Sequence, residues 1–400
     1  MNPVYLDNNA TTRVDAEVVA AMLPFFTEQF GNPSSMHAFG ADVGGAVKAA
    51  RKSLQSLIGA EFDHEIVFTS GGTESDNASI LSALEANPDR DEIITSSVEH
   101  PAILSLCAHL EKTRGIKVHI IPVDAKGRLD RDAYSAALSP KVAIASIMWA
   151  NNETGTIFPV AELAEEAKAV GALFHTDAVQ AVGKVPVDLK STAIDMLSLS
   201  GHKLHGPKGI GALYVKRGVR FRSQIKGGQQ ERGRRGGTEN TPGIVGLGKA
   251  AELAALHMEE EQTRVKALRD RLEKGLLQRI PNTFITGDVD NRLPNTCNIA
   301  CEYIEGEAIL LLLNRAGIAA SSGSACTSGS LEPSHVLRAM NIPYTAAHGA
   351  TRFSFSRDNV DEDVDRVLDA MPPIIEQLRQ LSPFWQGAGE APAEFKPVYA

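Results

Sequence analysis

Short apolar runs that alternate with helical patterns are the feature that most constrains the fold of this chain. The runs lie at 65–70, 92–97, 117–123, 141–149, 172–177, 196–201 and 211–216, and helical stretches at 75–86, 101–115 and 160–171 separate some of them. Strands that are apolar throughout are buried on both faces, and helices between strands make the crossovers of a parallel sheet. The sequence therefore predicts an α/β domain with a mainly parallel sheet.

The last third of the chain has a different pattern. A long charged helix is expected at roughly 250–280, and short strands at 295–303, 317–322 and 350–356 then mix with helices at 305–317 and 360–371. A chain of 400 residues exceeds what one compact core normally holds. We therefore expect a second, smaller α+β domain, followed by an irregular tail from Ser382.

The overall charge and the termini exclude several classes of function. A net charge of −9 argues against nucleic acid as the main partner. One segment, 216–235, carries eight basic residues and one acid, and a solvated loop is favoured there over a dedicated binding patch. We find neither a secretory signal nor an apolar run long enough to span a bilayer. With four cysteines in a chain of this length, the sequence indicates a reduced, cytoplasmic protein without a membrane partner.

Two motifs resemble binding sites for other ligands. Cys297 and Cys301 have the spacing of a metal half-site, but no second pair completes it, so two buried strand cysteines are expected. His202 and His205 form an HxxH pair without helical register or a completing carboxylate, which makes zinc a remote alternative. The glycines of GPKGIGALYV precede a strand and not a helix, which disfavours a dinucleotide site.

Polar residues collect directly after the apolar runs. They are Gly72, Thr73, Ser75, His100, Asn151, Asn152, Asp177, Gln180, Ser200, His202 and Lys203. Ligands of open parallel sheets bind outside the carboxyl ends of the strands, so we expect these residues at one edge. Any one of them is more often a helix cap or a satisfied loop group. So many together indicate a cofactor site.

Lys203 follows Ser-Gly-His at the end of one apolar run, where a buried amine would lie. Gly72, Thr73 and the helix that follows them offer an anion cradle, although no Gly-Lys-Ser/Thr follows as in a Walker loop. A phosphate cradle, a carboxylate (Asp177) and a lysine are the groups that pyridoxal phosphate requires. The carboxylate keeps the pyridine nitrogen protonated, and the lysine forms a Schiff base. The sequence therefore predicts a pyridoxal phosphate enzyme with Lys203 as its cofactor lysine.

Motifs along the whole chain strengthen this prediction. In order they read YLDNNATT, FGNPSS, TSGGTESDN, EHPA, NNETG, HTDAVQ, SGHKLHGPKG, RRGGTENTP, SGSACTSG and TRFSFSR. From Tyr5 to about Leu381 the chain resembles the cysteine desulfurases, which are fold-type I pyridoxal phosphate enzymes, and its C-terminal part is most similar to their nitrogen-fixation branch. The resemblance implies a large cofactor-binding domain at 15–257 and a small domain formed by 1–14 and 258–400.

The resemblance also implies roles for individual residues. Gly72, Thr73, Ser200, His202 and Thr238 would surround the phosphate, with Thr238 supplied by the other subunit of a homodimer with shared active sites. His100 would stack on the pyridine ring and handle protons, Asp177 would pair with the ring nitrogen, and Gln180 would meet the phenolic oxygen. Asn152 and Arg352 would hold the substrate carboxylate, Arg352 through a bidentate fork.

Cys326 stands in AASSGSACTSGSLEP among small and polar residues. A free cysteine is usually a buried, inert hydrophobe, but these neighbours offer little to pack against. A loop of this composition suits a nucleophile that moves between donor and acceptor, and without the resemblance the two readings are about even. With the resemblance, Cys326 is the expected catalytic thiol, and Lys203 and His100 are the other expected catalytic residues. Cys326 is also the one candidate metal ligand, because its persulfide could bind an iron–sulfur cluster transiently. Cys107 lies on an expected amphipathic helix and is read as structural.

The implied reaction converts L-cysteine to L-alanine and leaves the sulfur as a persulfide on Cys326. The persulfide would pass to an iron–sulfur scaffold protein, for general cluster assembly or for nitrogenase maturation. Two alternatives stay open. One is a related pyridoxal phosphate enzyme, such as a selenocysteine lyase or an aminotransferase, although a transaminase has no use for a loop cysteine. The other is a non-catalytic sulfur-delivery component, against which intact Lys203, Asp177 and Arg352 argue.

Overall fold

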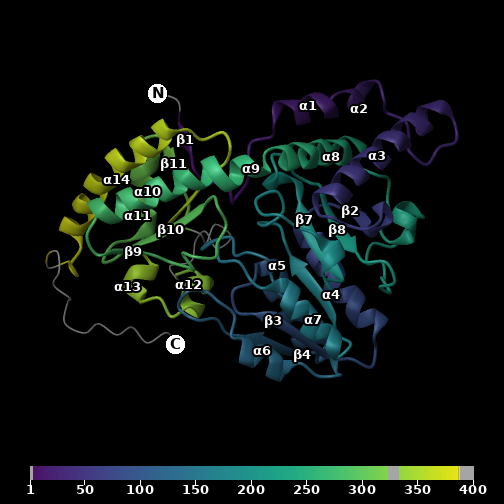
Figure 1. The fold of residues 1–400 in the computed structure, drawn as a ribbon, viewed down its shortest axis with the longest axis horizontal. Helices are drawn as coiled ribbons and strands as arrows, with labels where there is room; N and C mark the ends of the chain where they lie inside the picture. Colours follow the sequence, from purple (N-terminus) through teal and green to yellow (C-terminus); the bar gives the residue numbers. More distant parts are fainter. Residues whose placement is uncertain (1–2, 323–332, 386, 388–400) are drawn as a thin grey trace.

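The computed structural model describes residues 3–322, 333–385 and 387 of the chain, and its central element is a mixed seven-stranded sheet (Figure 1). In spatial order the strands are β2 (Ile66–Thr69), β8 (Gly211–Val215), β7 (Met196–Ser200), β6 (Leu173–Asp177), β5 (Val142–Ser146), β3 (Glu92–Ser96) and β4 (Lys117–Ile121). β8 is antiparallel to both of its neighbours, and the other neighbouring pairs are parallel. The predicted mainly parallel sheet is confirmed.

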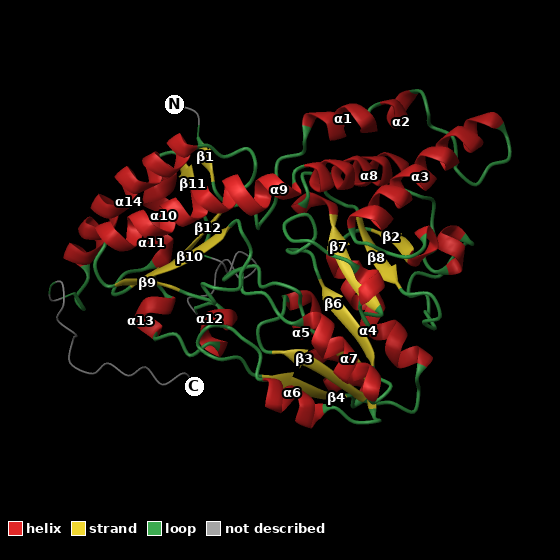
Figure 2. Cartoon of the chain, viewed as in Figure 1, coloured by secondary structure: helices red, strands yellow, loops and turns green. Residues whose placement is uncertain are grey.

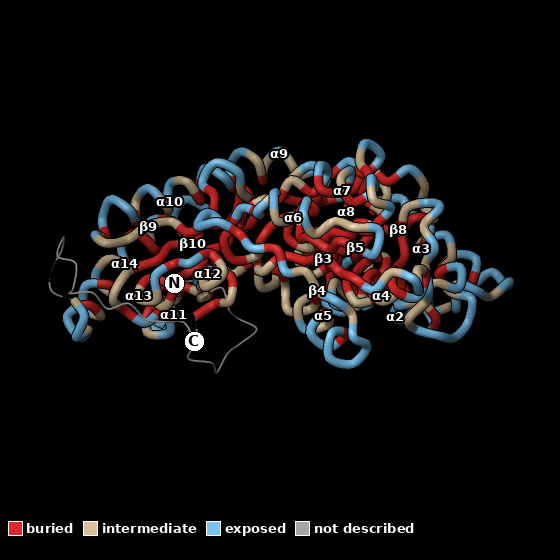
Figure 3. The backbone as a smooth tube through the Cα atoms, turned by 90° about the horizontal axis from the view of Figure 1, so that it is seen from below, coloured by how far each residue is buried: buried red, intermediate tan, exposed pale blue. Residues whose placement is uncertain are grey.

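Helices cover both faces of this sheet (Figure 2). One face carries α4 (Gly72–Ala86) and α5 (Pro101–Arg114), and the other carries α3 (Ala38–Leu57), α7 (Val160–Ala169) and α8 (Thr241–Leu256). Successive strand residues alternate between the two cores, as Val67 and Phe68 do. Shorter helices are α1 (Ala16–Met22), α2 (Pro24–Thr27) and α6 (Arg131–Ala137). Because both faces are covered, most of these strands are buried along their whole length (Figure 3).

The prediction of one continuous helix at 250–280 is wrong. The structure has α8 (Thr241–Leu256), α9 (Met258–Glu260), a π-helical segment (Glu261–Val265) and α10 (Lys266–Arg279). α8 begins earlier because Asn240 caps it, accepting a hydrogen bond from Gly243 N at 3.2 Å, and Pro242 occupies its first turn. We call the π-helical segment and α9 the connector, since they join α8 to α10.

The smaller part of the chain combines an antiparallel sheet with helices. β12 (Ala350–Ser354), β10 (Thr296–Cys301) and β9 (Thr283–Ile285) form the sheet in that order, and β1 (Val4–Tyr5) pairs with β11 (Ile318–Ala319). The helices are α11 (Gly306–Arg315), α12 (His335–Ala339), α13 (Tyr344–Ala347) and α14 (Asp361–Leu381). The predicted α+β character is confirmed, as is the position of Cys297 and Cys301 on a buried strand. The domain boundaries at 15–257 stay a prediction.

None of the helices within the described ranges is both long and apolar enough to span a bilayer.

The helices α3 and α8 approach each other closely at a glycine. A Cβ atom added to the buried Gly248 on α8 would lie 2.5 Å from both Cα and Cβ of Ala50 on α3. Real Cβ atoms do not come so near to backbone, so any side chain at 248 must push the two helices apart. By contrast, a Cβ atom added to the exposed Gly45 on α3 meets nothing within 4 Å.

Replacing Gly248 by alanine should therefore lower the thermal unfolding midpoint by several degrees. Overpacking costs about 1–3 kcal/mol, and this exceeds the up to about 1 kcal/mol that alanine gains over glycine in a helix. Circular dichroism melting measures the midpoint. Gly45→Ala is the matched control and should leave the midpoint unchanged or raise it. Equal midpoints for the two variants would contradict the close approach of α3 and α8.

Candidate active site

The carboxyl ends of the parallel strands open into a cavity of about 320 Å³. Its size lies within the range of small-molecule sites. It is lined by Asn9, Ala10, Gly72, Thr73, Asp76, His100, Met148, Ala150, Asn152, Asp177, Val179, Gln180, Ser200, His202, Lys203 and Arg352. The structure thus brings together most of the site residues that the sequence predicted. The exceptions are Ser75, Asn151, Thr238 and Cys326. Ser75 and Asn151 are buried and make hydrogen bonds within their own turns. Thr238 is exposed and does not line the cavity, and Cys326 lies outside the described residues.

Lys203 ends the short 3-10 helix Gly201–Lys203, which follows β7 directly. Its Nζ donates hydrogen bonds to the backbone oxygens of Asn9 at 2.5 Å and Ala10 at 2.6 Å. The turn is tight, because a Cβ atom at Gly201 would lie 3.0 Å from Pro207 O. The N-terminal segment therefore crosses over the strand end and fixes the amine at the cavity wall.

The N-terminus of α4 forms another part of the cavity wall. Gly71 precedes the helix with φ 156°, and Gly72 begins it. A Cβ atom at Gly72 would lie 2.8 Å from Val179 Cγ2 and 3.9 Å from Ser200 Cβ, so a side chain there would fill the space between the helix and the loop that follows β6. First-turn N–H groups have no partner within their own helix and favour anions. This wall is an open anion cradle.

The cavity lining also carries buried carboxyl groups. Asp177 ends β6 and accepts a hydrogen bond from Val179 N at 2.9 Å. Asp76 on α4 is 1% exposed, and its Oδ1 has no hydrogen-bond partner among the described residues. Burial raises the pKa of both carboxyls, and the charge of Asp177 raises the pKa of Asp76 further. Buried acids with unused hydrogen-bonding capacity suit a cationic or N–H-bearing ligand.

His100 is the N-cap of α5, and its Nδ1 accepts a hydrogen bond from Ala102 N at 3.1 Å. Burial lowers its pKa, so the ring is neutral near pH 7. A ring whose Nδ1 accepts must carry its proton on Nε2. His100 can therefore offer an N–H donor to a ligand in the cavity.

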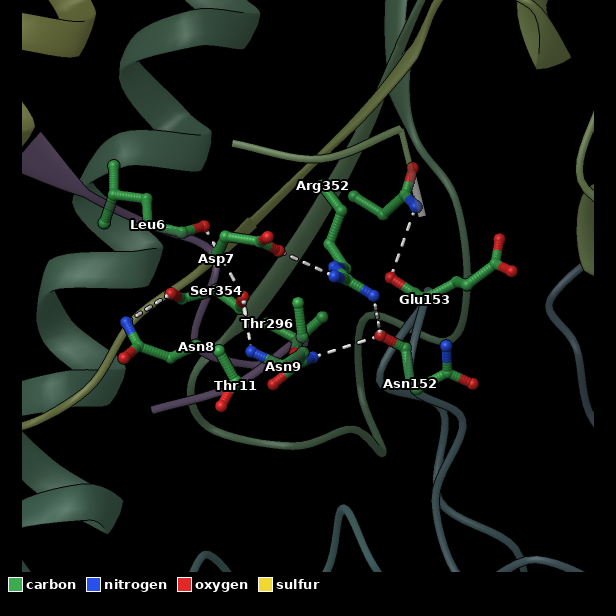
Figure 4. A network of polar contacts seen from close by, with 12 residues as sticks. Leu6, Asp7, Asn8, Asn9, Thr11, Asn152, Glu153, Thr296, Arg352 and Ser354 are labelled. Atoms are coloured by element: carbon green, nitrogen blue, oxygen red, sulfur yellow. Dashed lines mark hydrogen bonds and ion pairs between the residues drawn. The ribbon is translucent and has the colours of Figure 1, made fainter. Parts of the chain in front are cut away.

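Arg352 on β12 is 2% exposed and lines the cavity. Figure 4 shows it between Asp7 and Asn152. Its Nη1 donates to Asn152 O at 2.9 Å, and its Nη2 donates to Asp7 Oδ1 at 2.8 Å. Its Nε has no partner within the part of the chain that the structure describes. The guanidinium is thus held in place by two neighbours and keeps N–H groups for a further acceptor.

His202 and Gln180 are held by the N-terminal segment. The Nδ1 of His202 lies 3.2 Å from Thr11 Oγ1, and the Nε2 of Gln180 donates to Asn9 O at 2.9 Å. Burial, together with the charge of Lys203, lowers the pKa of His202 to about 4. His202 is therefore neutral and acts through hydrogen bonds and not through charge.

Sequence reasoning missed several cavity residues. Asn9 and Ala10 stand in the YLDNNATT motif, which was used only as a family signature and whose polar cluster could have indicated a site. Asp76 follows TSGGTES by one residue and could have been found as a helix position three or four residues after the cradle. Met148, Ala150 and Val179 give no polar signal, because they line the cavity with apolar atoms.

Burial makes the described cysteines poor nucleophiles. Cys107 on α5 is buried, as predicted, and its pKa is raised to about 12. Burial raises the pKa of Cys301 to about 11 and that of Cys297 well above its usual value. The thiolate is the reactive form, so these thiols stay inert near neutral pH. In the described ranges no group of three or more His, Cys, Asp or Glu residues could hold a metal ion.

Comparisons with known proteins agree on one family. The family model for class-V aminotransferases matches residues 4–367. A cysteine desulfurase of Gluconacetobacter diazotrophicus is 74% identical over the full length of both chains, and the cysteine desulfurase NifS of Azotobacter vinelandii is 65% identical over the full length of both. Among solved structures, a NifS-like protein superposes with a TM-score of 0.88 at 37% identity and covers 94% of this chain and 100% of its own.

The raised thiol pKa values predict the labelling pattern of the native protein. At pH 8 iodoacetamide should leave Cys107, Cys297 and Cys301 unmodified, because their thiolate fractions are below about 0.1% at pKa values of 11 or more. Peptide mass mapping locates the adducts, and the protein unfolded in urea is the control in which these thiols react. Labelling of Cys107 at the same rate in native and unfolded protein would show that its burial is wrong.

Proposed function

The chain belongs to the aminotransferase class-V family, and from this premise we propose that it is a pyridoxal phosphate-dependent cysteine desulfurase. It would convert L-cysteine to L-alanine and keep the sulfur as a protein persulfide. The observation that carries the proposal is the meeting of Lys203, Asp177 and the α4 cradle in one cavity, in a chain 65–74% identical to two cysteine desulfurases over its full length.

The cavity fits pyridoxal phosphate. The N-terminus of α4 with Gly72, Ser200 and His202 would hold the phosphate, and Asp177 would face the ring nitrogen. Asp76 lines the same cavity, and its Oδ1 makes no hydrogen bond among the described residues, with His175 Nε2 3.7 Å away. When bound, the cofactor supplies an electron sink for the bonds around the substrate Cα. Lys203 would hold it covalently, since its amine lies at the cavity wall.

The side chains around this group can hold and move protons. Lys203 Nζ is the base that would take the Cα proton of the substrate and return it to the carbon skeleton. His100 is neutral and carries an N–H on Nε2, so it would donate a hydrogen bond without adding charge. Gln180 would donate to the phenolic oxygen. These groups lie at the ends of different strands, and the sheet fixes their spacing.

Arg352 would bind the substrate carboxylate. Two of its five N–H groups already bind Asn152 O and Asp7, which leaves donors for one bidentate contact. The ion pair with Asp7 compensates the buried positive charge when no substrate is bound. Asn152 would contribute its side-chain amide, because it lines the same cavity.

Cys326 would be the sulfur acceptor within the protein. Its thiolate attacks Sγ of the substrate, an S–S bond forms and the Cβ–Sγ bond breaks. The released electron pair stays on the carbon skeleton, which takes up protons and leaves as L-alanine. The other three cysteines cannot replace Cys326 because burial keeps them protonated. The sulfur would then pass to a thiol of an iron–sulfur scaffold protein in the cytoplasm, and the likeness to NifS suggests service to nitrogenase maturation.

We also propose a homodimer with shared active sites. Thr238 is exposed and outside the cavity of its own chain, and the partner's phosphate site would receive it. Large apolar side chains from α1 to α3 are exposed and could be covered by the second copy; they are Leu23, Phe26, Phe30, Met36 and Phe39. The paired rings of Phe30 and Phe39, with centroids 5.8 Å apart, give this surface a defined shape.

Replacing Cys326 by serine tests the proposal. Cofactor binding and Cα chemistry depend on Lys203 and Asp177, so added L-cysteine should still change the visible absorbance of the variant. Alanine and persulfide formation should fall by at least about 100-fold, because a serine hydroxyl stays protonated near neutral pH. Cys107→Ser is the matched control and should retain wild-type turnover. Sulfide release by Cys326→Ser at the wild-type rate would identify the protein as another pyridoxal phosphate lyase.

A further inference from the structure

Lys184 is a buried lysine next to the site, and the proposed reaction leaves it without a role. It lies in the turn that follows β6 and is 5% exposed. Its Nζ donates hydrogen bonds to Gln180 Oε1 at 2.9 Å and to Gln180 O at 3.2 Å. A buried lysine is costly unless it is paired. Its position directly behind a cavity residue therefore calls for an explanation.

The contact fixes which end of the Gln180 amide faces the cavity. The charged form of Lys184 can only donate hydrogen bonds, so it must face the amide oxygen, as the contact with Gln180 Oε1 shows. The nitrogen is then directed the other way, and the Nε2 of Gln180 donates to Asn9 O at 2.9 Å. Gln180 lines the cavity and, in this orientation, presents a donor to it. Without Lys184 the carbonyl of Asn9 would be the remaining group that orients the amide.

Lys184 is itself held by the connector between α8 and α10. The side chain of Gln262 donates a hydrogen bond to Lys184 O, and Glu261 on the π-helical segment attracts the Lys184 ammonium. Burial lowers the pKa of Lys184 to about 7 and raises that of Glu261 to about 7, while each charge favours the other. The charged and titratable groups that surround Lys184 are Glu261, Lys203, His205, His257, Arg352 and Arg357.

We propose that Lys184 is a positioning residue that holds Gln180 as a hydrogen-bond donor toward the phenolic oxygen of the cofactor. The inference rests on the proposed pyridoxal phosphate site. It assigns no contact between Lys184 and the cofactor or the substrate. The evidence for it is that Lys184 makes buried contacts with Gln180 on one side and with the connector on the other.

The expected effect is on the colour of the holoenzyme as pH changes. The visible band changes when the nitrogen that links Lys203 to the cofactor loses its proton. A donor at the phenolic oxygen makes that oxygen less able to stabilise this proton, so the donor lowers the pKa of the nitrogen. The visible band therefore changes at a lower pH when the donor is present. Lys184→Met should raise this pH by about half a unit to one unit, the size of one ordinary hydrogen bond. Gln180→Leu removes the donor itself and should raise it by a similar amount.

The test is a spectrophotometric pH titration of the reconstituted wild type, Lys184→Met, Gln180→Leu and the double variant. If Lys184 acts through Gln180, the double variant should shift no further than the larger single shift. Additive shifts would overturn the inference, since they would mean that the lysine charge acts directly. Lys168→Met, which removes a lysine with a 68% exposed side chain, is the matched control and should not shift.

Two further outcomes separate this inference from the proposed function. If the wild type binds no pyridoxal phosphate, both are overturned. If the wild type and Lys168→Met titrate normally and Lys184→Met matches them, only the inference is overturned. If Lys184→Met does not fold, Lys184→Gln replaces it in the titration. Glutamine can present either end of its amide and no longer dictates the orientation of Gln180, so an upward shift is expected and an unchanged titration would overturn the inference.

Discussion

The backbone oxygen of Asn9 is the point on which the arrangement of the site depends. It accepts hydrogen bonds from Lys203 Nζ at 2.5 Å and from Gln180 Nε2 at 2.9 Å. The side chain of the same residue donates to Asn152 O at 3.1 Å and to Thr296 Oγ1 at 2.8 Å. One buried residue near the N-terminus therefore ties three strand ends of the large sheet to β10 of the small sheet. Figure 4 shows the contact of its side chain with Asn152. Buried polar networks of this kind hold their members in one geometry only when every member is satisfied.

Acidic and basic groups both line the cavity. Asp76 and Asp177 are its buried acids, and Lys203 and Arg352 are its cations. Burial raises the pKa of both acids, while the charges of His100 and Lys203 favour the ionised form of Asp177. A ligand that carries both a cationic ring nitrogen and anionic groups suits a lining of this kind. In so buried a site, a charge acts strongly on a bound ligand.

Much of the site was predictable because the ends of buried strands can be located in the sequence, where an apolar run gives way to polar residues. His100, Asp177 and Lys203 each follow an apolar run, and the parallel topology alone brings them to one edge. The contribution of Asn9 was not predictable in this way, because its main contact uses a backbone oxygen, which no residue type reveals. Lys184 was missed for a related reason: a lysine in a turn reads as exposed until tertiary packing covers it. The single predicted helix at 250–280 failed because local helical propensity does not show where a chain passes from one core to another.

Attachment of the cofactor to Lys203 is the feature on which all the proposed chemistry depends. The protein should be incubated with pyridoxal phosphate, reduced with borohydride and mapped by peptide mass spectrometry. Lys184 is the informative competitor, because it lies close by and burial lowers its pKa to about 7. We expect the reduced adduct on the peptide that contains Lys203, and an unmodified Lys184. An adduct on Lys184, or on any other lysine with Lys203 unmodified, would contradict this expectation.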